Sequence, residues 1–507
     1  MESVIKNPEV RIRPFSNVYI GTGNGLIKKR LKEGLDAIGG LQKFIRPGQS
    51  VFIKPNLTAT QDEMTGGVTD IRSCAALIEL IQEECQPGHM MVGENTLQGG
   101  VIAVYFETHG WVDMCKKYGV ELVDFDKDEW ERYPVRDGMW FESVCLPKKF
   151  VEADCLISLS VLKNHDTVMV TGGIKNSFGC ISANERREAH RQFAIEQSIV
   201  DVARVRKPDI SILDGRIGME GIAGGSHFNH PRYANRIIIG DDPVATDAVA
   251  SHVMEQNPRV RYLQWCDEYG IGNANLDYIN FPGMSIEEAK VKFMSPGEEV
   301  EESTDGRIHV LDTGACSRCI TPVMSALHRF FLPENVAVTA DILMGPNEVN
   351  FDEKGRNEKL VCIGDCVLQK YRDAGYCVKG CPVTQEDFFE IMNQENILCH
   401  ACETAVLEWI DSKKPEDIDF LRILASNRTV YKGKNNHAEA TDYVLGVGNC
   451  QAEYIHYHKE RSKQEFADIG VTTDINDIVG FVPGHHVTVE QIEAEYQRLK
   501  AHHDANA

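Results

Sequence analysis

Eight of the sixteen cysteines of this 507-residue chain lie in four short fragments between residues 316 and 402. The fragments are CSRC (316–319), CIGDC (362–366), CVKGCP (377–382) and CHAC (399–402). Cysteines gathered in this way are typical of an iron–sulfur or zinc site, because thiolates are strong ligands for both metals. The clustering constrains the fold of this region more than any other feature, since several loops must bring their thiols to one centre.

Length and composition set the broad class of the protein. A chain of 507 residues is too long for one hydrophobic core, and its 42% hydrophobic and 25% charged residues are typical of a globular protein. The 53 basic against 76 acidic residues, a formal charge of −23, argue against a nucleic-acid partner. No apolar run reaches the roughly 18 residues of a membrane span. The first fifteen residues lack a secretory-signal pattern, so we expect a cytoplasmic protein with reduced thiols and no membrane partner.

Short apolar runs alternate with amphipathic helical patterns along most of the chain. SVFIKP (50–55) and HMMVGE (89–94), for example, flank a helical pattern that begins after Asp70. Further strands are predicted at ELVDFD (121–126), DCLISLS (154–160), DISILDG (209–215), RIIIGDD (236–242), RIHVLDTG (307–314), VAVTADILMG (336–345) and KLVCIGDC (359–366). The alternation predicts an α/β fold with mostly parallel sheets and flanking helices, in which ligands bind at the carboxyl ends of the strands.

An acidic stretch divides the chain into two or more expected domains. Residues 297–306 contain GEEVEES and favour a solvated linker, although a charged loop within one domain is the alternative. We expect a substrate- or cofactor-binding domain at 1–296 and a cysteine-rich, flavodoxin-like domain at 307–425. The remainder, 426–507, is expected to form a C-terminal extension.

This extension is predicted to consist of a long loop and a helix. The polar stretch at 427–443 has the composition of a loop, and Thr488 and Gln491 have the spacing of a capping box at the start of the final helix.

Four of the clustered cysteines are predicted to form one metal centre. Cys316 and Cys319 precede a helix, whose exposed amides stabilise thiolates, while Cys366 ends a strand and Cys381 lies in a Gly-Cys-Pro turn. This order resembles the cluster-binding fold of the small subunit of nickel–iron hydrogenases and of the related quinone-reductase subunit. The resemblance implies a [4Fe-4S] cluster at the edge of a flavodoxin-like sheet, and it departs at Val383, where that family usually has a second proline.

The remaining clustered cysteines are compatible with several kinds of site. A second cluster could use Cys362, Cys377, Cys399 and Cys402, or these could be spare thiols beside a single cluster. A structural zinc ion, or no metal at all, would also be compatible with these cysteines. The spacing favours iron, because structural zinc sites usually use two tight CxxC knuckles. The scattered Cys74, Cys85, Cys115, Cys145, Cys155, Cys180 and Cys266 are interpreted as small core residues.

The N-terminal half contains six motifs in a fixed order. They are VFIKPNLT (51–58), TGGVTD (65–70), VGEN (92–95), VLKNHDTVMVTGGIKNSFG (161–179), ILDG (212–215) and DDPVATDAVA (241–250). Together they resemble the domain of unknown function 362 family. The family is largely uncharacterised and often joined to iron–sulfur modules, so the resemblance supports treating the two halves as one redox unit.

One of these motifs has a second resemblance. The GGIKN turn (172–176), with His165 before it and His190 after it, is similar to the core of lactate-racemase-like proteins. There a histidine, a Gly-Gly-x-Lys turn and a later histidine surround a pyridinium-type nickel cofactor. The similarity implies that Lys175 fixes a cofactor or substrate and that the two histidines are acid/base groups or metal ligands. VGEN (92–95) stands where that family has a further catalytic histidine segment, which argues against racemisation with a nickel cofactor.

Charged residues at predicted strand ends complete the candidate cleft. Lys54 beside the turn at 65–67 could hold a carboxylate or phosphate, whereas an ordinary surface lysine is the alternative. Asp70, and either Asp241 or Asp242 before Pro243, fit helix caps at least as well as catalysis. The candidate catalytic residues are Lys175, His165, His190 and Glu94, and the candidate substrate-binding residues are Lys54, Thr65, Gly66, Gly67, Gly172, Gly173, Asn176 and Asp247.

These features predict an iron–sulfur oxidoreductase. A [4Fe-4S] cluster would pass electrons to a small, anionic organic substrate in the N-terminal cleft, with a ferredoxin or flavoprotein as the electron donor. Two alternatives are a non-catalytic electron-transfer or cluster-assembly protein, and a non-redox iron–sulfur lyase or sulfur-transfer enzyme. A homodimer is left open, and the substrate is not predicted.

Overall fold

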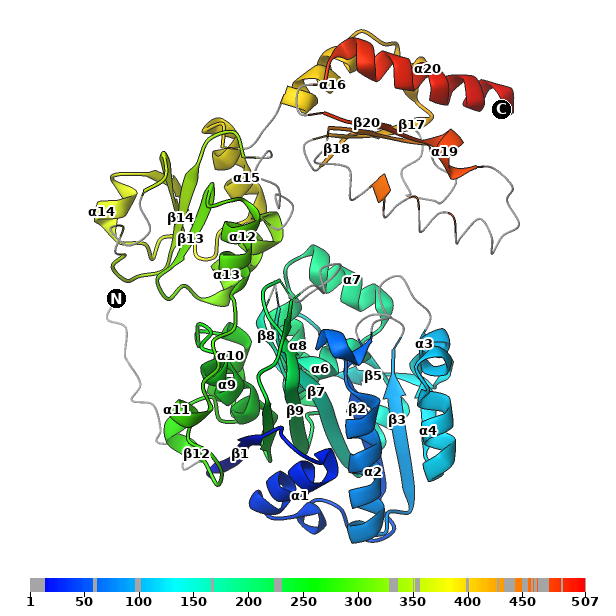
Figure 1. Ribbon diagram of the computed structural model, residues 1–507, viewed down its shortest axis with the longest axis vertical. Helices are drawn as coiled ribbons and strands as arrows, with labels where there is room; N and C mark the ends of the chain where they lie inside the picture. The colour runs from blue at the N-terminus through cyan, green and yellow to red at the C-terminus, as the bar shows by residue number, and fades with distance from the viewer. Residues whose placement is uncertain are drawn as a thin grey trace. The chain divides into compact units, whose positions relative to one another are not determined.

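The computed structural model describes residues 14–57, 62–95, 102–165, 168–222, 230–327, 336–349, 351, 356–397, 401–425, 428–432, 443–448, 455–456, 459, 463, 474–484 and 487–506. The chain divides into two compact units, Met1–Pro296 and Gly297–Ala507 (Figure 1). Within the described ranges, none of the helices combines the length and the apolar character that crossing a membrane requires.

A ten-stranded sheet forms the centre of the N-terminal unit. Its order is β12-β1-β11-β9-β7-β2-β3-β4, with β10 beside β9 and β8 beside β7. The strands are β1 (Ser16–Thr22), β2 (Ser50–Pro55), β3 (His89–Glu94), β4 (Glu121–Asp124), β7 (Cys155–His165), β8 (Met169–Thr171), β9 (Ile210–Met219), β10 (Pro231–Arg232), β11 (Arg236–Gly240) and β12 (Ile279–Asn280). From β9 to β4 the main strands are parallel, whereas β11 is antiparallel to β9 and β1. The predicted mixed α/β fold with a mostly parallel sheet is confirmed.

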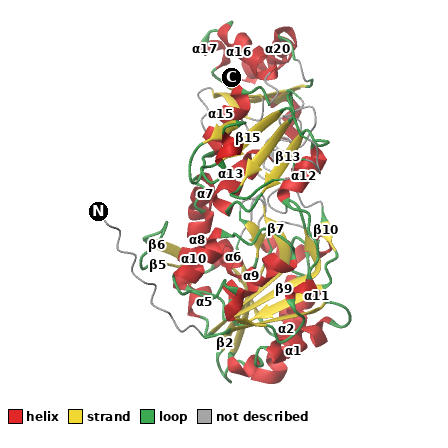
Figure 2. Cartoon of the chain, turned by 90° about the vertical axis from the view of Figure 1, so that its left-hand side faces the viewer, coloured by secondary structure: helices red, strands yellow, loops and turns green. Residues whose placement is uncertain are grey.

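Helices lie on both sides of this sheet (Figure 2). They are α1 (Ile27–Ala37), α2 (Ile71–Cys85), α3 (Ile102–Thr108), α4 (Trp111–Tyr118), α5 (Lys148–Glu152), α6 (Gly173–Asn176), α7 (Ala183–Arg191), α8 (Ile195–Val205), α9 (Pro243–Val253), α10 (Arg261–Glu268) and α11 (Ile286–Ala289), and β5 (Trp130–Pro134) and β6 (Ser143–Pro147) form a separate hairpin. On one face, α1, α2 and α4 pack their apolar side chains against alternate residues of β2, β7 and β9, such as Ile53, Ile157 and Ile212. This alternation is what the period of two along a strand requires.

Two aspartates begin helices that the sheet positions. The carboxylate of Asp70 accepts the Arg72 backbone N–H at 2.8 Å at the start of α2, and that of Asp242 accepts the Val244 N–H at 3.0 Å at the start of α9. Both residues therefore have a capping role, and Asp242 rather than Asp241 is the cap of α9.

The first strand of the chain is placed by residues far along the sequence. β1 lies between β11 and β12. Its Ser16 hydroxyl donates to the Asp242 carboxylate at 2.8 Å, and the same carboxylate accepts the Asn273 backbone N–H at 2.8 Å. The side chain that begins α9 therefore also anchors the start of β1.

The second unit contains a four-stranded parallel sheet in the order β13-β14-β15-β16. Its elements are α12 (Pro296–Ser303), β13 (Ile308–Asp312), α13 (Ser317–Leu327), β14 (Ala340–Met344), β15 (Lys359–Ile363), α14 (Gln369–Arg372), β16 (Tyr376–Val378) and α15 (Gln385–Gln394). The strands follow one another in chain order, whereas a flavodoxin-like sheet has its first strand between the second and third. The sheet therefore has the parallel strands of the predicted flavodoxin-like arrangement, but its strand order differs.

A second four-stranded sheet, in the order β18-β17-β19-β20, replaces the expected loop-and-helix extension. Its elements are α16 (Ala401–Asp411), α17 (Pro415–Ile418), β17 (Leu421–Ala425), β18 (Arg428–Lys432), β19 (Tyr443–Val447), α19 (Ile475–Ile478), β20 (Val479–Val482) and α20 (Val489–Asn506). Part of the stretch predicted as a loop is thus strand β18, paired antiparallel with β17. The capping box before α20 is present, with the Thr488 N–H on Gln491 Oε1 at 2.9 Å.

The acidic stretch at 297–306 is a helix rather than a solvated linker. In α12, Val300 is fully buried and Glu299 is 8% exposed, and the following Thr304 donates its hydroxyl to the Val300 carbonyl at 2.8 Å. The acidic composition of the segment pointed to a solvent-exposed stretch, although its one apolar residue, Val300, packs inward. The segment is therefore helical where a solvated linker was expected.

Candidate functional site

A buried ion pair joins the ends of two neighbouring parallel strands. Lys54 at the end of β2 donates to the Glu94 carboxylate at the end of β3, with 2.7 Å between Nζ and Oε2. Both side chains are almost fully buried, at 2% and 3% exposed. The other Glu94 oxygen accepts the Asn95 backbone N–H at 2.9 Å, and Leu57 N–H donates to Oε2 at 3.0 Å. The positive charge of Lys54 is therefore balanced by the Glu94 carboxylate.

Asn176 connects this ion pair to the third strand, β7. Its amide nitrogen donates to the Lys54 carbonyl at 2.9 Å and to the Ser158 hydroxyl at 3.1 Å. Its amide oxygen accepts from Lys54 Nζ at 3.3 Å and from Asn56 Nδ2 at 3.2 Å. This one side chain thereby ties α6 to the carboxyl edge of the sheet.

The Gly-Gly turn before Lys175 is held by Asp247 of α9. The Gly173 and Ile174 backbone N–H groups donate to the two carboxylate oxygens at 2.6 and 3.1 Å. A Cβ atom on Gly172 would lie 2.1 Å from the same carboxylate, so the turn has no room for a side chain there. Burial raises the pKa of Asp247 to about 7, against the opposing effect of these backbone donors. Asp247 is a positioning residue for the turn.

Two lysines lie close to each other at this edge of the sheet. Lys163 is buried on β7 and donates to the Gly67 carbonyl at 2.9 Å. Burial and the charge of Lys175 lower the pKa of Lys163 to about 7. Lys175, on α6, is 9% exposed. Two cationic groups in a buried environment favour an anionic ligand, because each positive charge raises the free-energy cost of burying the other.

The candidate histidines lie on opposite sides of this turn in the sequence. His165 ends β7 and is paired across the hairpin with Met169 of β8. On α7, Nδ1 of His190 donates to the Arg186 carbonyl at 2.8 Å, and its ring packs against Phe178. That bond fixes the tautomer of a neutral His190 ring and makes Nε2 its acceptor nitrogen.

The glycine turn at 65–67 packs against β9. Gly66 has a left-handed φ of 71°, and a Cβ atom there would lie 2.1 Å from the Gly218 carbonyl oxygen. The Thr65 hydroxyl donates to the Asp62 carbonyl at 2.8 Å and accepts the Gly67 N–H at 3.2 Å. Thr65 and Gly66 therefore shape the turn, and Gly67 supplies the carbonyl that Lys163 binds.

A charged network beside this turn was not predicted as a unit. Arg216 of β9 donates through Nη2 to Asp70 at 2.8 Å, to Asp214 at 2.7 Å and to the Ser73 hydroxyl at 2.6 Å. Asp70 and Asp214 belong to separate motifs, TGGVTD and ILDG, and neither motif contains the arginine that they share. Only the strand pairing places Arg216 next to α2, and no local motif signals it.

In the second unit, the loops after β13, β15 and β16 bring four thiols together. The Cys319 and Cys316 thiols are hydrogen-bonded to each other, and the Cys366 thiol interacts with those of Cys316 and Cys381. Cys319 is buried, Cys316 is half-buried, and Cys366 and Cys381 are exposed. The bond to Cys316, with burial second, raises the pKa of Cys319, and burial raises that of Cys366.

Glycines and backbone N–H groups support this four-thiol centre, which is defined by Cys316, Cys319, Cys366 and Cys381. Gly345, Gly364 and Gly380 have positive φ angles of 96°, 85° and 130°. A Cβ atom on Gly364 would lie 3.4 Å from the Cys319 sulfur. The Gly345 N–H donates to the Cys366 sulfur and the Val383 N–H to the Cys319 sulfur, and both bonds oppose, without reversing, the rise in the pKa of these thiols.

The remaining predicted metal ligands are placed differently. Cys362 and Cys377 lie on the neighbouring strands β15 and β16. Burial raises the pKa of Cys362 to about 12. Cys399 and the side chain of Cys402 lie outside the described residues. Among the residues that are described, no group of three or more His, Cys, Asp or Glu side chains is arranged to hold a metal ion. An iron–sulfur cluster, like a structural zinc ion, stays a prediction.

Comparisons with known proteins find similarity in the N-terminal region. Residues 51–252 match the family described as "Domain of unknown function (DUF362)". The chain is 28% identical over 239 residues to "Thylakoid-associated protein sll1697" from Synechocystis sp. (strain ATCC 27184 / PCC 6803 / Kazusa), which covers 46% of this chain and 72% of that protein. Among solved structures, it is similar to the lactate racemase apoprotein from Thermoanaerobacterium thermosaccharolyticum, with a TM-score of 0.33 and 10% identity, over 77% of this chain and 92% of that one.

Proposed function

Starting from an N-terminal unit that contains a DUF362 domain, we propose that the protein is an oxidoreductase that acts on a small anionic substrate. An iron–sulfur cluster would be held by the four-thiol centre. The substrate would bind near Lys163 and Lys175, at the carboxyl edge of the ten-stranded sheet.

The observation that carries this proposal is the meeting of four thiols from three loops. Cys316 and Cys319 come from the loop and helix after β13, Cys366 from the loop after β15 and Cys381 from the loop after β16. Four thiolate ligands are what a [4Fe-4S] cluster requires, and such a cluster would supply electrons one at a time. The backbone N–H groups of Gly345 and Val383 would remain as donors to the ligand sulfurs, where such bonds influence the reduction potential.

The two lysines support an anionic substrate. Lys163 is buried with Lys175 close enough to lower its pKa, so an anion seated against both would offset a charge repulsion that the fold already contains. With a pKa near 7, Lys163 can give or take a proton at neutral pH, which suits a step in which reduction and protonation occur together. Asp247 would keep Lys175 in place through the Gly172–Gly173 turn.

The first test is the metal content of the full chain purified without oxygen. About four irons per chain and an electron paramagnetic resonance signal after dithionite reduction are expected for one cluster. Single Cys→Ser variants of the four-thiol centre are compared with Cys266→Ser, which removes a buried cysteine of α10 in the N-terminal unit. One zinc ion without iron in the wild type would contradict the proposal.

The second test concerns the lysines. The reduced protein is incubated with a metabolite extract of the native host, and consumed anions are identified by mass spectrometry. Lys163→Met and Lys175→Met are expected to lose turnover with the iron content unchanged, while Lys116→Met, on the exposed side of α4, keeps both. Unchanged turnover in both lysine variants would contradict a substrate site at these residues and leave electron transfer by the cysteine centre as the function.

A further inference from the structure

Two cysteines outside the four-thiol centre form a pair of their own. Cys362 on β15 is the register partner of Cys377 on β16, in a parallel pairing. Directly paired residues of neighbouring strands point to the same face of the sheet, with a strand separation of about 4.8 Å. A disulfide needs Cα atoms about 4.4 to 6.8 Å apart. The backbone is therefore placed for a bridge without a rearrangement of the sheet.

The side chains confirm that the two thiols face each other. They are hydrogen-bonded to one another, and the Cys377 thiol also donates to the Arg372 carbonyl at 3.3 Å. Cys362 is fully buried in an apolar cluster with Leu343 and Leu360, against which Cys377 packs from its half-buried position. One thiol of the pair can thus be reached from outside, and the other lies behind it.

We propose that Cys362 and Cys377 are a redox-active dithiol, which closes to a disulfide by exchange with a small disulfide-containing molecule. This inference goes beyond the proposed function and does not depend on a metal in the four-thiol centre. It gives the protein a site that takes up or releases two electrons together.

The exchange balances in two steps. The Cys377 thiolate attacks one sulfur of the small disulfide, the bond between its two sulfurs breaks, and the first small thiol leaves. Cys362 then loses its proton and attacks the Cys377 sulfur, which forms the Cys362–Cys377 bond and releases the second small thiol. The two cysteines are oxidised, the small disulfide is reduced to two thiols, and both protons end on those thiols. The reverse exchange, with excess small thiol, reopens the pair.

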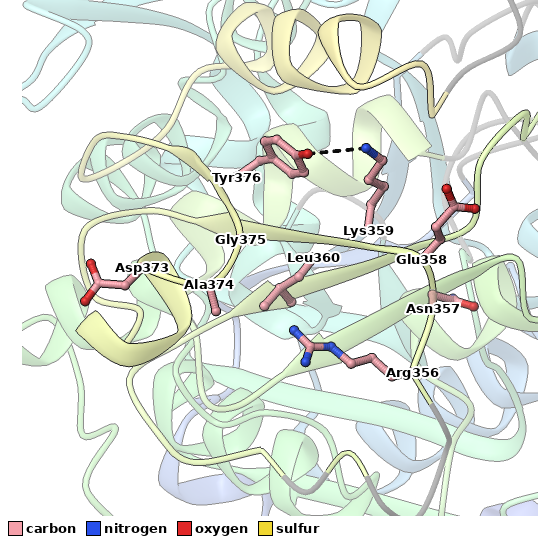
Figure 3. Close-up of a pocket in the computed structure, with 9 residues that line it drawn as sticks. All are labelled: Arg356, Asn357, Glu358, Lys359, Leu360, Asp373, Ala374, Gly375 and Tyr376. Atoms are coloured by element: carbon pink, nitrogen blue, oxygen red, sulfur yellow. Dashed lines mark hydrogen bonds between the residues drawn. The ribbon is translucent and has the colours of Figure 1, made fainter.

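A pocket lies next to the pair, although neither cysteine is among the residues that line it in Figure 3. Its volume is about 680 Å³, within the range of small-molecule sites, about 300 to 1,000 Å³. It is lined by Leu360, which also packs with Cys362, and by residues 373–376, which lead directly to Cys377. Lys359, hydrogen-bonded to the Tyr376 hydroxyl at 3.3 Å, lies on another side of the pocket.

The pocket lining contains two cationic and two anionic side chains, Arg356 and Lys359 against Glu358 and Asp373, so its net charge does not select a ligand. Arg356, in the pocket lining, and Arg372 both act on the Cys362 thiol in the direction that lowers its pKa. They oppose the larger effect of burial. Because these two arginines act at the cysteine pair, a disulfide that carries carboxylates, such as oxidised glutathione, is expected to react with it more readily than a cationic one such as cystamine.

The experiment uses the full chain purified without oxygen. It is incubated with oxidised glutathione or with dithiothreitol, free thiols are alkylated in denaturant, and the protein is digested with trypsin. The expected change is a shift from two alkylated peptides, 360–370 and 373–379, to one bridged species that dithiothreitol removes. Fragmentation between Cys362 and Cys366 assigns the bridge, since both lie in the first peptide. Cystamine at the same concentration is expected to give less bridge.

Three variants complete the design. Cys362→Ser and Cys377→Ser are expected to lose the bridge while the iron content of the protein stays that of the wild type. Cys145→Ser, which removes a half-buried cysteine of the N-terminal unit, should keep the bridge. The inference is overturned if the wild type forms no bridge in oxidised glutathione. It is also overturned if iron is lost in both pair variants and retained in Cys145→Ser, because the two thiols would then be cluster ligands.

Discussion

At the carboxyl edge of the ten-stranded sheet, the charges of Lys54 and Glu94 pair at 2.7 Å. At the carboxyl edge of the β13–β16 sheet, by contrast, four thiols interact with one another. The first arrangement is complete within the protein, since both charges are buried and hydrogen-bonded. In the second, each thiol makes ionisation of its neighbour harder. The lysine–glutamate site is therefore expected to be rigid without a ligand, and the thiol centre to gain stability from a metal.

The largest effect is expected from Cys319→Ser, which removes the buried thiol of the four-thiol centre. Most of the bound iron should be lost, and the thermal midpoint of the second unit should fall, because metal-binding free energy contributes to folding free energy. Metal analysis and differential scanning calorimetry measure the two effects, with Cys266→Ser as the control. Iron retained at the wild-type level in Cys319→Ser would contradict the expectation that the thiol centre, unlike the lysine–glutamate site, gains stability from a bound metal.

The next largest effect is expected from Lys54→Met in the other site. Breaking a buried ion pair leaves Glu94 without its countercharge and should cost about 3 to 5 kcal/mol of unfolding free energy. The matched control is Lys28→Met, which breaks exposed pairs with Glu83 at 2.6 Å and Glu79 at 3.0 Å and should cost far less, since water already screens these charges. Urea unfolding measures both. Equal losses in the two variants would show that Lys54 and Glu94 are not held in the rigid, desolvated arrangement described above.

A smaller effect is expected from Asp247→Ala. The Gly173 and Ile174 N–H groups would lose their acceptor, at a cost of about 1 to 3 kcal/mol, and their amide hydrogens should exchange faster. Hydrogen exchange followed by mass spectrometry tests this prediction. Asp36→Ala, on the exposed surface of α1, is the control and should leave the exchange of the 172–176 turn unchanged. An unchanged turn in Asp247→Ala as well would contradict a positioning role.

The last effect is a pH dependence of stability that comes from Lys163. Its pKa is lowered from 10.5 to about 7, so between these values the unfolded chain binds more protons than the folded chain. Wild-type stability should therefore rise with pH across this window, by at most about 1.4 kcal/mol per pH unit from this group. Lys163→Met lacks this contribution, so the wild type should gain on the variant between about pH 7 and about pH 10. Parallel pH profiles from urea unfolding would argue against a buried, titrating lysine.

The regular elements that local patterns determine could be predicted from the sequence. β2 and β3 have the bounds of the apolar runs SVFIKP and HMMVGE, because both strands are buried for nearly their whole length. β18 was missed, because Arg428–Lys432 is polar and becomes a strand only through pairing with β17. α12 was missed for a similar reason, since one buried valine among glutamates gives a weak helical signal.

The candidate sites divide in the same way. The cysteine spacing pointed to Cys316, Cys319, Cys366 and Cys381, because loop cysteines after parallel strands converge at one edge of a sheet. The Lys54–Glu94 pair could not be derived, because the two residues are 40 positions apart and meet only through the pairing of β2 with β3. Lys163 lies within an apolar strand, and only the packing around β7 shows that its side chain is buried.

The place of β1 between β11 and β12 has a consequence for synthesis of the chain. Ser16 reaches its partner Asp242 across 226 positions, so the strand cannot pair until well over 200 further residues have left the ribosome. At about 5 to 20 residues per second, this takes on the order of 10 to 45 s. During that time β2, β3 and β4 can already assemble, while the apolar residues of β1 remain uncovered. We expect the nascent N-terminal segment to be the part of this protein that most needs a chaperone.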